Sequence, residues 1–220
     1  MFDSKNWLTL YLDAPMQSWG YQSRFHRRTT LPYPTKSGII GMLCAAMGVP
    51  KSDKVMISRL AGLRMYVYVL SAVRRMTDFH TVGGGYDPKT ERGWIPRKAD
   101  GGKPSTVVTH REYLLGGAKF GVLLNGNTAL LGDCETALAD PKWGVWFGRK
   151  SCIPASPICQ GRFGSKEEAR RHLEAISGSK AIRRVEEVLR FEDGTDTLLD
   201  VPVDFSTRDF TVRRVADEAL

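Results

Sequence analysis

The chain has 220 residues, of which 42% are hydrophobic, and a formal net charge of +8 at pH 7. This length and apolar content fit one large domain, or one domain with an appendage. No apolar run reaches the ~18 residues of a membrane span, and the N-terminal segment lacks the features of a signal peptide, which predicts a cytoplasmic protein without membrane contact. The surplus of Lys and Arg is compatible with a solvated surface or with a polyanionic partner.

The first part of the chain predicts alternating strands and helices. Residues 7–12 (WLTLYL) alternate in polarity, which is typical of a half-buried strand. Residues 35–48 predict a helix with Thr35 as its N-cap and a stop at Gly48. A second strand at 63–71, a third at 118–126, a short helix at 133–140 and a short strand within 145–152 follow.

An irregular basic segment lies between the second and third of these strands. From Arg74 to about Arg111 no period of two or 3.6 residues persists, and glycines and prolines interrupt the segment. A stretch of this length without regular structure is uncommon in a compact domain and is usually functional or disordered. Because its charges are mostly positive, we expect a basic arm that projects from the domain.

Together these elements predict an α+β fold with a ferredoxin-like (RRM-like) body over residues 1–150, into which the arm, or thumb, is inserted at 74–112. Residues 151–220 predict a smaller β-rich extension that packs on the body. In it, a capping box at Ser165 to Glu168 precedes a helix to about Ile176, residues 181–191 fit either a strand or a helix, and residues 197–205 predict a strand.

The segment PYPTKSGIIG, Pro32 to Gly41, superficially resembles a nucleotide-binding loop. With Lys36 as its lysine, a Walker A motif requires glycines at positions 30 and 35, where this chain has Thr30 and Thr35. We therefore do not expect a nucleotide site. The free N–H groups of a helix start, together with Lys36, suit an anion, which predicts a phosphate of RNA; in the alternative, Thr35 caps the helix and Lys36 is solvated.

Two further segments have the composition of RNA-binding sites. In QSWGYQSRFHRR, residues 17–28, aromatic side chains that could stack on bases alternate with arginines that could meet phosphates. In GRKS, residues 148–151, a glycine precedes two cations and a hydroxyl, a combination that allows close approach to a phosphate. A loop whose aromatics return to the core, and an ordinary basic turn, would have the same compositions.

Catalysis and metal binding have weaker support in the sequence. The candidate bases for a metal-independent ribonuclease are His26, His80, His110 and His172, and no motif positions any two of them together. The four cysteines form no C-x-x-C pair, and the acidic residues do not cluster as in a two-metal nuclease. The sequence therefore predicts no catalytic residues, no metal and no cofactor.

Four segments carry a resemblance to a known family: APMQSWGYQSRFHRRTTLPYPTKSGIIGMLCAAMGV, DFHTVGGGYD, THREYLLGGAKFGVLL and FGRKSC, in that order. From about Leu8 to Val215 the chain resembles the CasD family, RAMP-type subunits of type I-E CRISPR Cascade complexes. The resemblance implies a non-catalytic subunit that caps the 5′ handle of CRISPR RNA and contacts the Cascade backbone subunit and the large PAM-reading subunit. Target DNA would be read by guide pairing in the assembled complex. The equivalent subunit of the related type I-C branch cleaves repeat RNA, so the alternative is a metal-independent endoribonuclease.

The predicted RNA-binding residues come from these segments and fall into four roles. Stacking surfaces and phosphate-binding cations lie in the loop, at the helix start and in the basic turn; base edges would be read by small polar side chains; and the arm would press between neighbouring bases. The complete set is Gln17, Ser18, Trp19, Tyr21, Arg24, Phe25, Arg27, Arg28, Lys36, Ser37, His80, Thr81, Arg111, Gly148, Arg149, Lys150 and Ser151.

Overall fold

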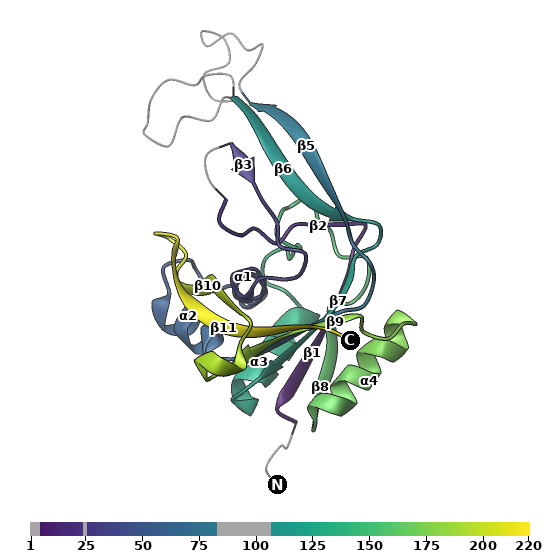
Figure 1. Cartoon of the computed structure of the whole chain (residues 1–220). Helices are drawn as coiled ribbons and strands as arrows, with labels where there is room; N and C mark the ends of the chain where they lie inside the picture. Colours follow the sequence, from purple (N-terminus) through teal and green to yellow (C-terminus); the bar gives the residue numbers. More distant parts are fainter. Residues whose placement is uncertain (1–4, 24–25, 83–106) are drawn as a thin grey trace.

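The body of the protein has the β-α-β-β-α-β order of the ferredoxin-like fold (Figure 1). The computed structural model describes residues 5–23, 26–82 and 107–220. Four strands pair antiparallel in the order β4-β7-β1-β8, and α1 and α3 connect them. The predicted α+β class and ferredoxin-like body are therefore confirmed. The elements are β1 (Trp7–Asp13), α1 (Lys36–Met47), β4 (Arg64–Val69), β7 (Lys119–Asn125), α3 (Thr128–Ala139) and β8 (Cys159–Phe163).

The C-terminal strands extend the same sheet from the β4 edge. The order continues β4-β9-β11-β10, which makes a seven-stranded sheet with β8 and β10 at its edges. Residues 181–191, whose sequence pattern fits either a strand or a helix, contain the strand β9. The strand β10 was predicted from the sequence, whereas β11 was not. The predicted domain boundary at 150 falls before β8, the fourth strand of the body. The added elements are β9 (Arg183–Val188), η1 (Phe191–Asp193), β10 (Asp196–Asp204) and β11 (Asp209–Ala219).

Helices cover both faces of the central strands. On one face α1 and α3 pack over Leu8, Leu10 and Leu12 of β1, and on the other α4 (Lys166–Ser177) packs over Tyr11. The predicted half-buried character of β1 is wrong, because the inner residues on both of its faces are buried. A further helix, α2 (Lys54–Ala61), contacts β10. Among the described residues, no helix has the length and apolar character that crossing a membrane requires.

The ends of the helices follow their capping residues. The N-cap of α1 is Thr35, whose side chain accepts from the Gly38 N–H, and its C-cap is Gly48 in the left-handed conformation, both as predicted. Ser165 caps α4 in the same way. The helix predicted at 133–140 is longer than expected, because Asn127 caps α3 and starts it at residue 128.

The arm has a regular stem, which corrects the prediction of an irregular segment. The strands β5 (Arg74–Val82) and β6 (Val107–Leu115) form an antiparallel hairpin that rises from the body (Figure 1). On its other edge, β6 pairs with the short strands β2 (Met16–Gln17) and β3 (Arg27–Arg28). The glycine- and proline-rich part of the predicted arm, 83–106, lies outside the described residues.

Candidate nucleic-acid interface

The loop after β1 is held on the body by Trp19. The Trp19 N–H donates to Thr30 Oγ1 at 2.7 Å, and the Leu31 N–H donates to the Trp19 carbonyl at 2.9 Å. The indole is completely buried, and its N–H donates to Gln17 Oε1 at 3.1 Å. The predictions that Trp19 stacks on a base and that Gln17 reads a base edge are therefore wrong, because neither side chain reaches the surface.

The start of α1 is occupied by a carboxylate of the protein itself. The Lys36 N–H donates to Asp200 Oδ2 at 2.7 Å, and Lys36 Nζ donates to the two carboxylate oxygens of Glu187 at 3.0 and 2.8 Å. The Arg213 guanidinium donates to both oxygens of Asp200 at 2.7 and 3.0 Å. We call Lys36, Glu187, Asp200 and Arg213 the buried charge cluster. It joins α1 to the three C-terminal strands.

This cluster contradicts the role predicted for Lys36. The side chain of Lys36 is only 2% exposed, so it neither binds an RNA phosphate nor is solvated. Burial lowers the pKa of Lys36, and the neighbouring Glu187 carboxylate opposes that shift. The anion that the sequence predicted at this helix start is therefore Asp200. Of the segment's three polar residues, Thr35 and Ser37 line the cavities described below, and Lys36 does not.

The Gly-Arg-Lys-Ser turn packs directly on the loop after β1. Gly148 has φ +92°, and a Cβ added to it would lie 1.7 Å from the Ser18 carbonyl oxygen. The Ser18 N–H donates to the Phe147 carbonyl at 3.1 Å, and the Ser18 side chain is buried, with Oγ donating to the Glu112 carbonyl at 3.0 Å. The glycine thus permits close approach of another protein segment. No strand forms at 145–152, contrary to the prediction.

We expect Gly148→Ala to lower the free energy of unfolding by more than about 2 kcal/mol. The alanine would have to adopt a left-handed backbone conformation, and its Cβ would clash with the backbone of Ser18. Urea denaturation measures this loss. Gly116→Ala is the matched control, since Gly116 has φ +85° and nothing lies within 4 Å of an added Cβ. Equal losses in the two variants would show that the contact with Ser18 contributes nothing.

Arg149 lies beside the loop rather than in open solvent. Its guanidinium lies 4.4 Å from the centre of the Tyr113 ring and donates to the Arg28 carbonyl at 3.0 Å. Its Nη1 is buried and has no hydrogen-bond partner within the described part of the chain. The two residues that follow in the turn, Lys150 and Ser151, are exposed. The turn therefore places a cation beside Arg28, at the loop's exposed end.

Two adjoining cavities, of about 340 and 350 Å³, lie between the loop, the start of α1, the turn and the β10–β11 hairpin. They share Gly20, Ser23, Arg28, Ser37 and Phe210, and we call them together the groove. Arg28 is exposed beside it, so the groove offers a cation together with hydroxyl groups and an aromatic ring. The predicted residues that line it are Ser18, Trp19 from its buried floor, Tyr21, Arg28, Ser37, Gly148 and Arg149.

The hairpin contributes groove residues that the sequence analysis missed. Phe205 and Arg208 line the groove from the turn between β10 and β11, and Phe210 lines it from the start of β11. Arg208 has φ +58°, the left-handed conformation typical of a tight turn. The only signal in the sequence is the aromatic and basic composition of DFSTRDF, which no motif connects to a loop far away in the chain.

Other predicted residues lie on the arm. Arg27 on β3, and His80, Thr81 and Arg111 on the hairpin, are outside the groove. Arg24 and Phe25 lie outside the described residues. His80 contacts Asp78 through Nε2, and the His110 N–H donates to the His26 carbonyl at 2.8 Å. These predicted contacts with RNA stay predictions.

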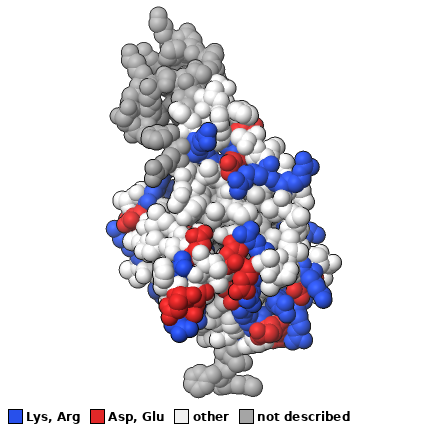
Figure 2. Space-filling view, in the orientation of Figure 1, with Lys and Arg blue, Asp and Glu red and all other residues white. Residues whose placement is uncertain are grey.

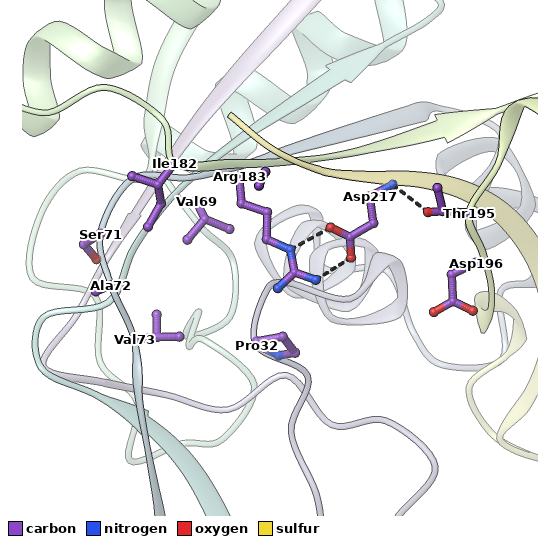
Figure 3. Close-up of a pocket in the computed structure, with 11 residues that line it drawn as sticks. Pro32, Val69, Ser71, Ala72, Val73, Ile182, Arg183, Thr195, Asp196 and Asp217 are labelled. Atoms are coloured by element: carbon purple, nitrogen blue, oxygen red, sulfur yellow. Dashed lines mark hydrogen bonds and ion pairs between the residues drawn. The ribbon is translucent and has the colours of Figure 1, made fainter.

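A further cavity, of about 630 Å³, lies at the root of the arm (Figure 3). Arg183 points across it to Asp217, with two hydrogen bonds of 2.6 Å, and Asp196 lies on its wall (Figure 3). Because two carboxylates accompany a single cation there, the cavity is a poor site for phosphate. None of the predicted RNA-binding residues that the structure describes lines it.

The cysteines are structural. Burial raises the pKa of Cys44 to about 11 and that of Cys134 to about 12, so both thiols stay protonated at neutral pH. Burial also raises the pKa of Cys152 and Cys159. Over the ranges that the structure describes, no three His, Cys, Asp or Glu side chains form a group that could hold a metal ion.

Much of the basic surplus is balanced locally in the body. Acidic and basic side chains intermix over the face of the body that Figure 2 shows. By contrast, no acidic partner for Arg27, Arg28 or Arg111 appears among the described residues. These three cations, like the exposed Lys150 and Arg208, are therefore available for an external anion.

Comparisons with known proteins show the family of the chain. The family described as CRISPR-associated protein (Cas_Cas5) matches residues 7–216. The chain is similar to CRISPR system Cascade subunit CasD of Escherichia coli (strain K12), with 27% identity over 226 residues, 94% of this chain and 96% of the relative. It is also 30% identical to a chain of a solved CRISPR RNA-guided surveillance complex, with a TM-score of 0.78 over 97% of this chain and 89% of that chain. A crystal structure of a Cas protein is likewise 30% identical, with a TM-score of 0.67 over 97% of this chain and 94% of that chain. The chain therefore belongs to the Cas5 family of CRISPR-associated proteins and is CasD-like, of type I-E.

Proposed function

We propose that this chain is a subunit of a type I-E Cascade surveillance complex that binds and caps the 5′ handle of CRISPR RNA. In this role it acts in the cytoplasm, without catalytic activity of its own. It contacts the backbone subunit and the large PAM-reading subunit and so helps to anchor them. Target DNA meets the assembled complex, where guide pairing reads its sequence.

The observation that carries the proposal is the groove. Arg28 and Arg149 lie beside each other at its edge, and the buried Nη1 of Arg149 is a donor without a partner in the described structure. Ser23, Ser37 and Phe210 supply hydroxyl groups and an aromatic ring. A cationic channel that also offers hydrogen bonds and a ring is suited to an unpaired strand of RNA.

The histidines give the endoribonuclease no comparable support. His172 packs against Phe163, with ring centroids 5.0 Å apart, on the α4 side of the sheet, far from the groove in the fold. His80 is paired with Asp78 on the arm. General base catalysis needs a base within hydrogen-bond reach of the attacking hydroxyl, next to cations that stabilise the phosphorane. Among the described residues no histidine lines the groove, and His26 and His110 meet outside it through a backbone hydrogen bond.

We expect Arg28→Ala to weaken binding of RNA that carries repeat sequence at its 5′ end. Because Arg28 would neutralise one phosphate, the slope of log affinity against log salt should fall by about 0.7 to 1. Filter binding at several salt concentrations measures the slope. Arg171→Ala is the control, since this exposed arginine lies on α4, on the opposite face of the sheet from α1.

The same samples test the remaining parts of the proposal. RNA recovered from the assay in EDTA should be intact on a denaturing gel, and a discrete cleavage product would overturn the non-catalytic role. Co-expression with the backbone subunit should give co-purification. If the wild-type chain binds repeat-derived RNA no better than an unrelated RNA, and no partner co-purifies, the proposed function fails.

A further inference from the structure

Three side chains form a row across the arm. The strand order there is β3-β6-β5, and the register places Arg27 opposite His110 and His110 opposite Phe79. Directly opposed residues of neighbouring strands project to the same face of a sheet. Arg27, His110 and Phe79 therefore stand side by side on one face. By the same register, Arg28, Arg111 and Asp78 form the row on the other face.

Phe79 is exposed in a way that packing within the chain does not explain. Its side chain is 67% exposed, although its ring touches His110 edge to face, with centroids 4.7 Å apart. Val108, on the same face, is 47% exposed. A large aromatic side chain left in water on a projecting hairpin has no role in the core. Two exposed apolar side chains on one face of a projecting hairpin make this face a candidate binding surface.

The charge of the row favours a nucleic acid as the occupant. Arg27 is exposed and has no acidic partner within the described ranges, and it stands at one end of the row. An unpaired base could lie on the Phe79 ring while its phosphate meets the Arg27 guanidinium, the combination by which single-stranded RNA is held. A purely apolar protein partner would leave this cation desolvated without compensation.

We propose that Phe79, braced by His110, is a stacking platform for one unpaired base of the bound RNA, with Arg27 on the neighbouring phosphate. The proposal rests on the proposed function and adds a contact outside the groove. The platform holds a base by its face, so it contributes affinity at one nucleotide without selecting its identity.

The test combines Phe79 variants with RNA that lacks single bases. Phe79→Ala should weaken binding of repeat-derived RNA by about 5- to 150-fold with an unchanged salt slope, because stacking involves no counterion release. Phe79→Trp should retain binding. Removing each base in turn from the RNA should reveal one position at which the affinity of the wild-type protein falls. The affinity of Phe79→Ala should not change when the base at that position is removed.

Val108→Ala is the matched control, an exposed apolar residue on the same face without a ring. Each variant should unfold at the wild-type temperature, since the side chains are exposed. Unchanged RNA affinity in Phe79→Ala would overturn the platform while leaving the proposed function intact. If that variant also lost co-purification with the backbone subunit, the face would be a protein contact. Failure of the wild-type chain to prefer repeat-derived RNA over an unrelated RNA, together with the absence of a co-purifying partner, would instead overturn the proposed function.

Discussion

Asp200→Ala is expected to lower the free energy of unfolding by about 3–5 kcal/mol. Asp200 is completely buried, and its carboxylate accepts from the Lys36 N–H and from Arg213, which is itself only 6% exposed. Removing the carboxylate leaves two buried cations, Lys36 and Arg213, with the single carboxylate of Glu187, which lies 3.9 Å from Arg213 Nη1. It also leaves the first N–H of α1 without an acceptor. Both consequences penalise the folded state.

Urea denaturation measures the loss, with Asp209→Ala as the control because Asp209 is an exposed aspartate at the start of the partner strand β11. The control should change stability by less than about 0.5 kcal/mol. The double variant Asp200→Ala with Arg213→Met should recover part of the loss, because it removes the excess positive charge from the interior. Equal effects of Asp200→Ala and Asp209→Ala would contradict the role assigned to the buried charge cluster.

Trp19→Ala should lower the free energy of unfolding by about 3–5 kcal/mol, because it removes a fully buried indole that packs against Phe147 at 5.9 Å between ring centroids. Trp19→Phe should cost less, about 1–3 kcal/mol, since it leaves Gln17 Oε1 without its donor. Thermal and urea unfolding measure both losses. Trp143→Ala is the control, since Trp143 is 47% exposed.

RNA binding separates the core role of Trp19 from the stacking role that its sequence context predicted. Per folded molecule, Trp19→Phe should bind repeat-derived RNA with wild-type affinity, because no part of the indole is exposed. A tenfold loss of affinity at unchanged stability would restore the stacking interpretation.

The features that the sequence predicted well are those with local causes. Thr35 and Gly48 mark the two ends of α1, as predicted, because capping depends on neighbouring backbone groups. The buried strands β4 and β7 were predicted because they are rich in apolar side chains. The arm's stem was missed for a physical reason. Neither face of β5 is covered along its length, so no burial imposes the alternation of apolar and polar residues by which strands are recognised.

The misplaced site residues have distant causes. Lys36 can be buried because it pairs with Glu187, which lies 151 residues further along the chain. The sequence around Lys36 does not indicate that partner. Gly148 and Ser18 lie far apart in the sequence and touch in the folded structure, so GRKS has the composition of a phosphate loop but packs on protein. Composition identified the right regions for the groove, at Arg28 and Arg149, but not which side chains face it.

The arm continues the β4–β7 pair, and this continuity limits how its reach can vary among relatives. At the end of the β4–β7 pair, Val69 pairs with Phe120, and the Leu70 N–H donates to the Lys119 carbonyl at 2.9 Å. The β5–β6 pairing begins a few residues further on, with Arg74 opposite Leu115. Adding one residue to each strand would lengthen the hairpin by about 3.4 Å without disturbing the body, but would turn every outer side chain to the opposite face. Only steps of two residues per strand, about 7 Å, keep the orientation. The reach of this ribbon is thus expected to evolve in discrete increments.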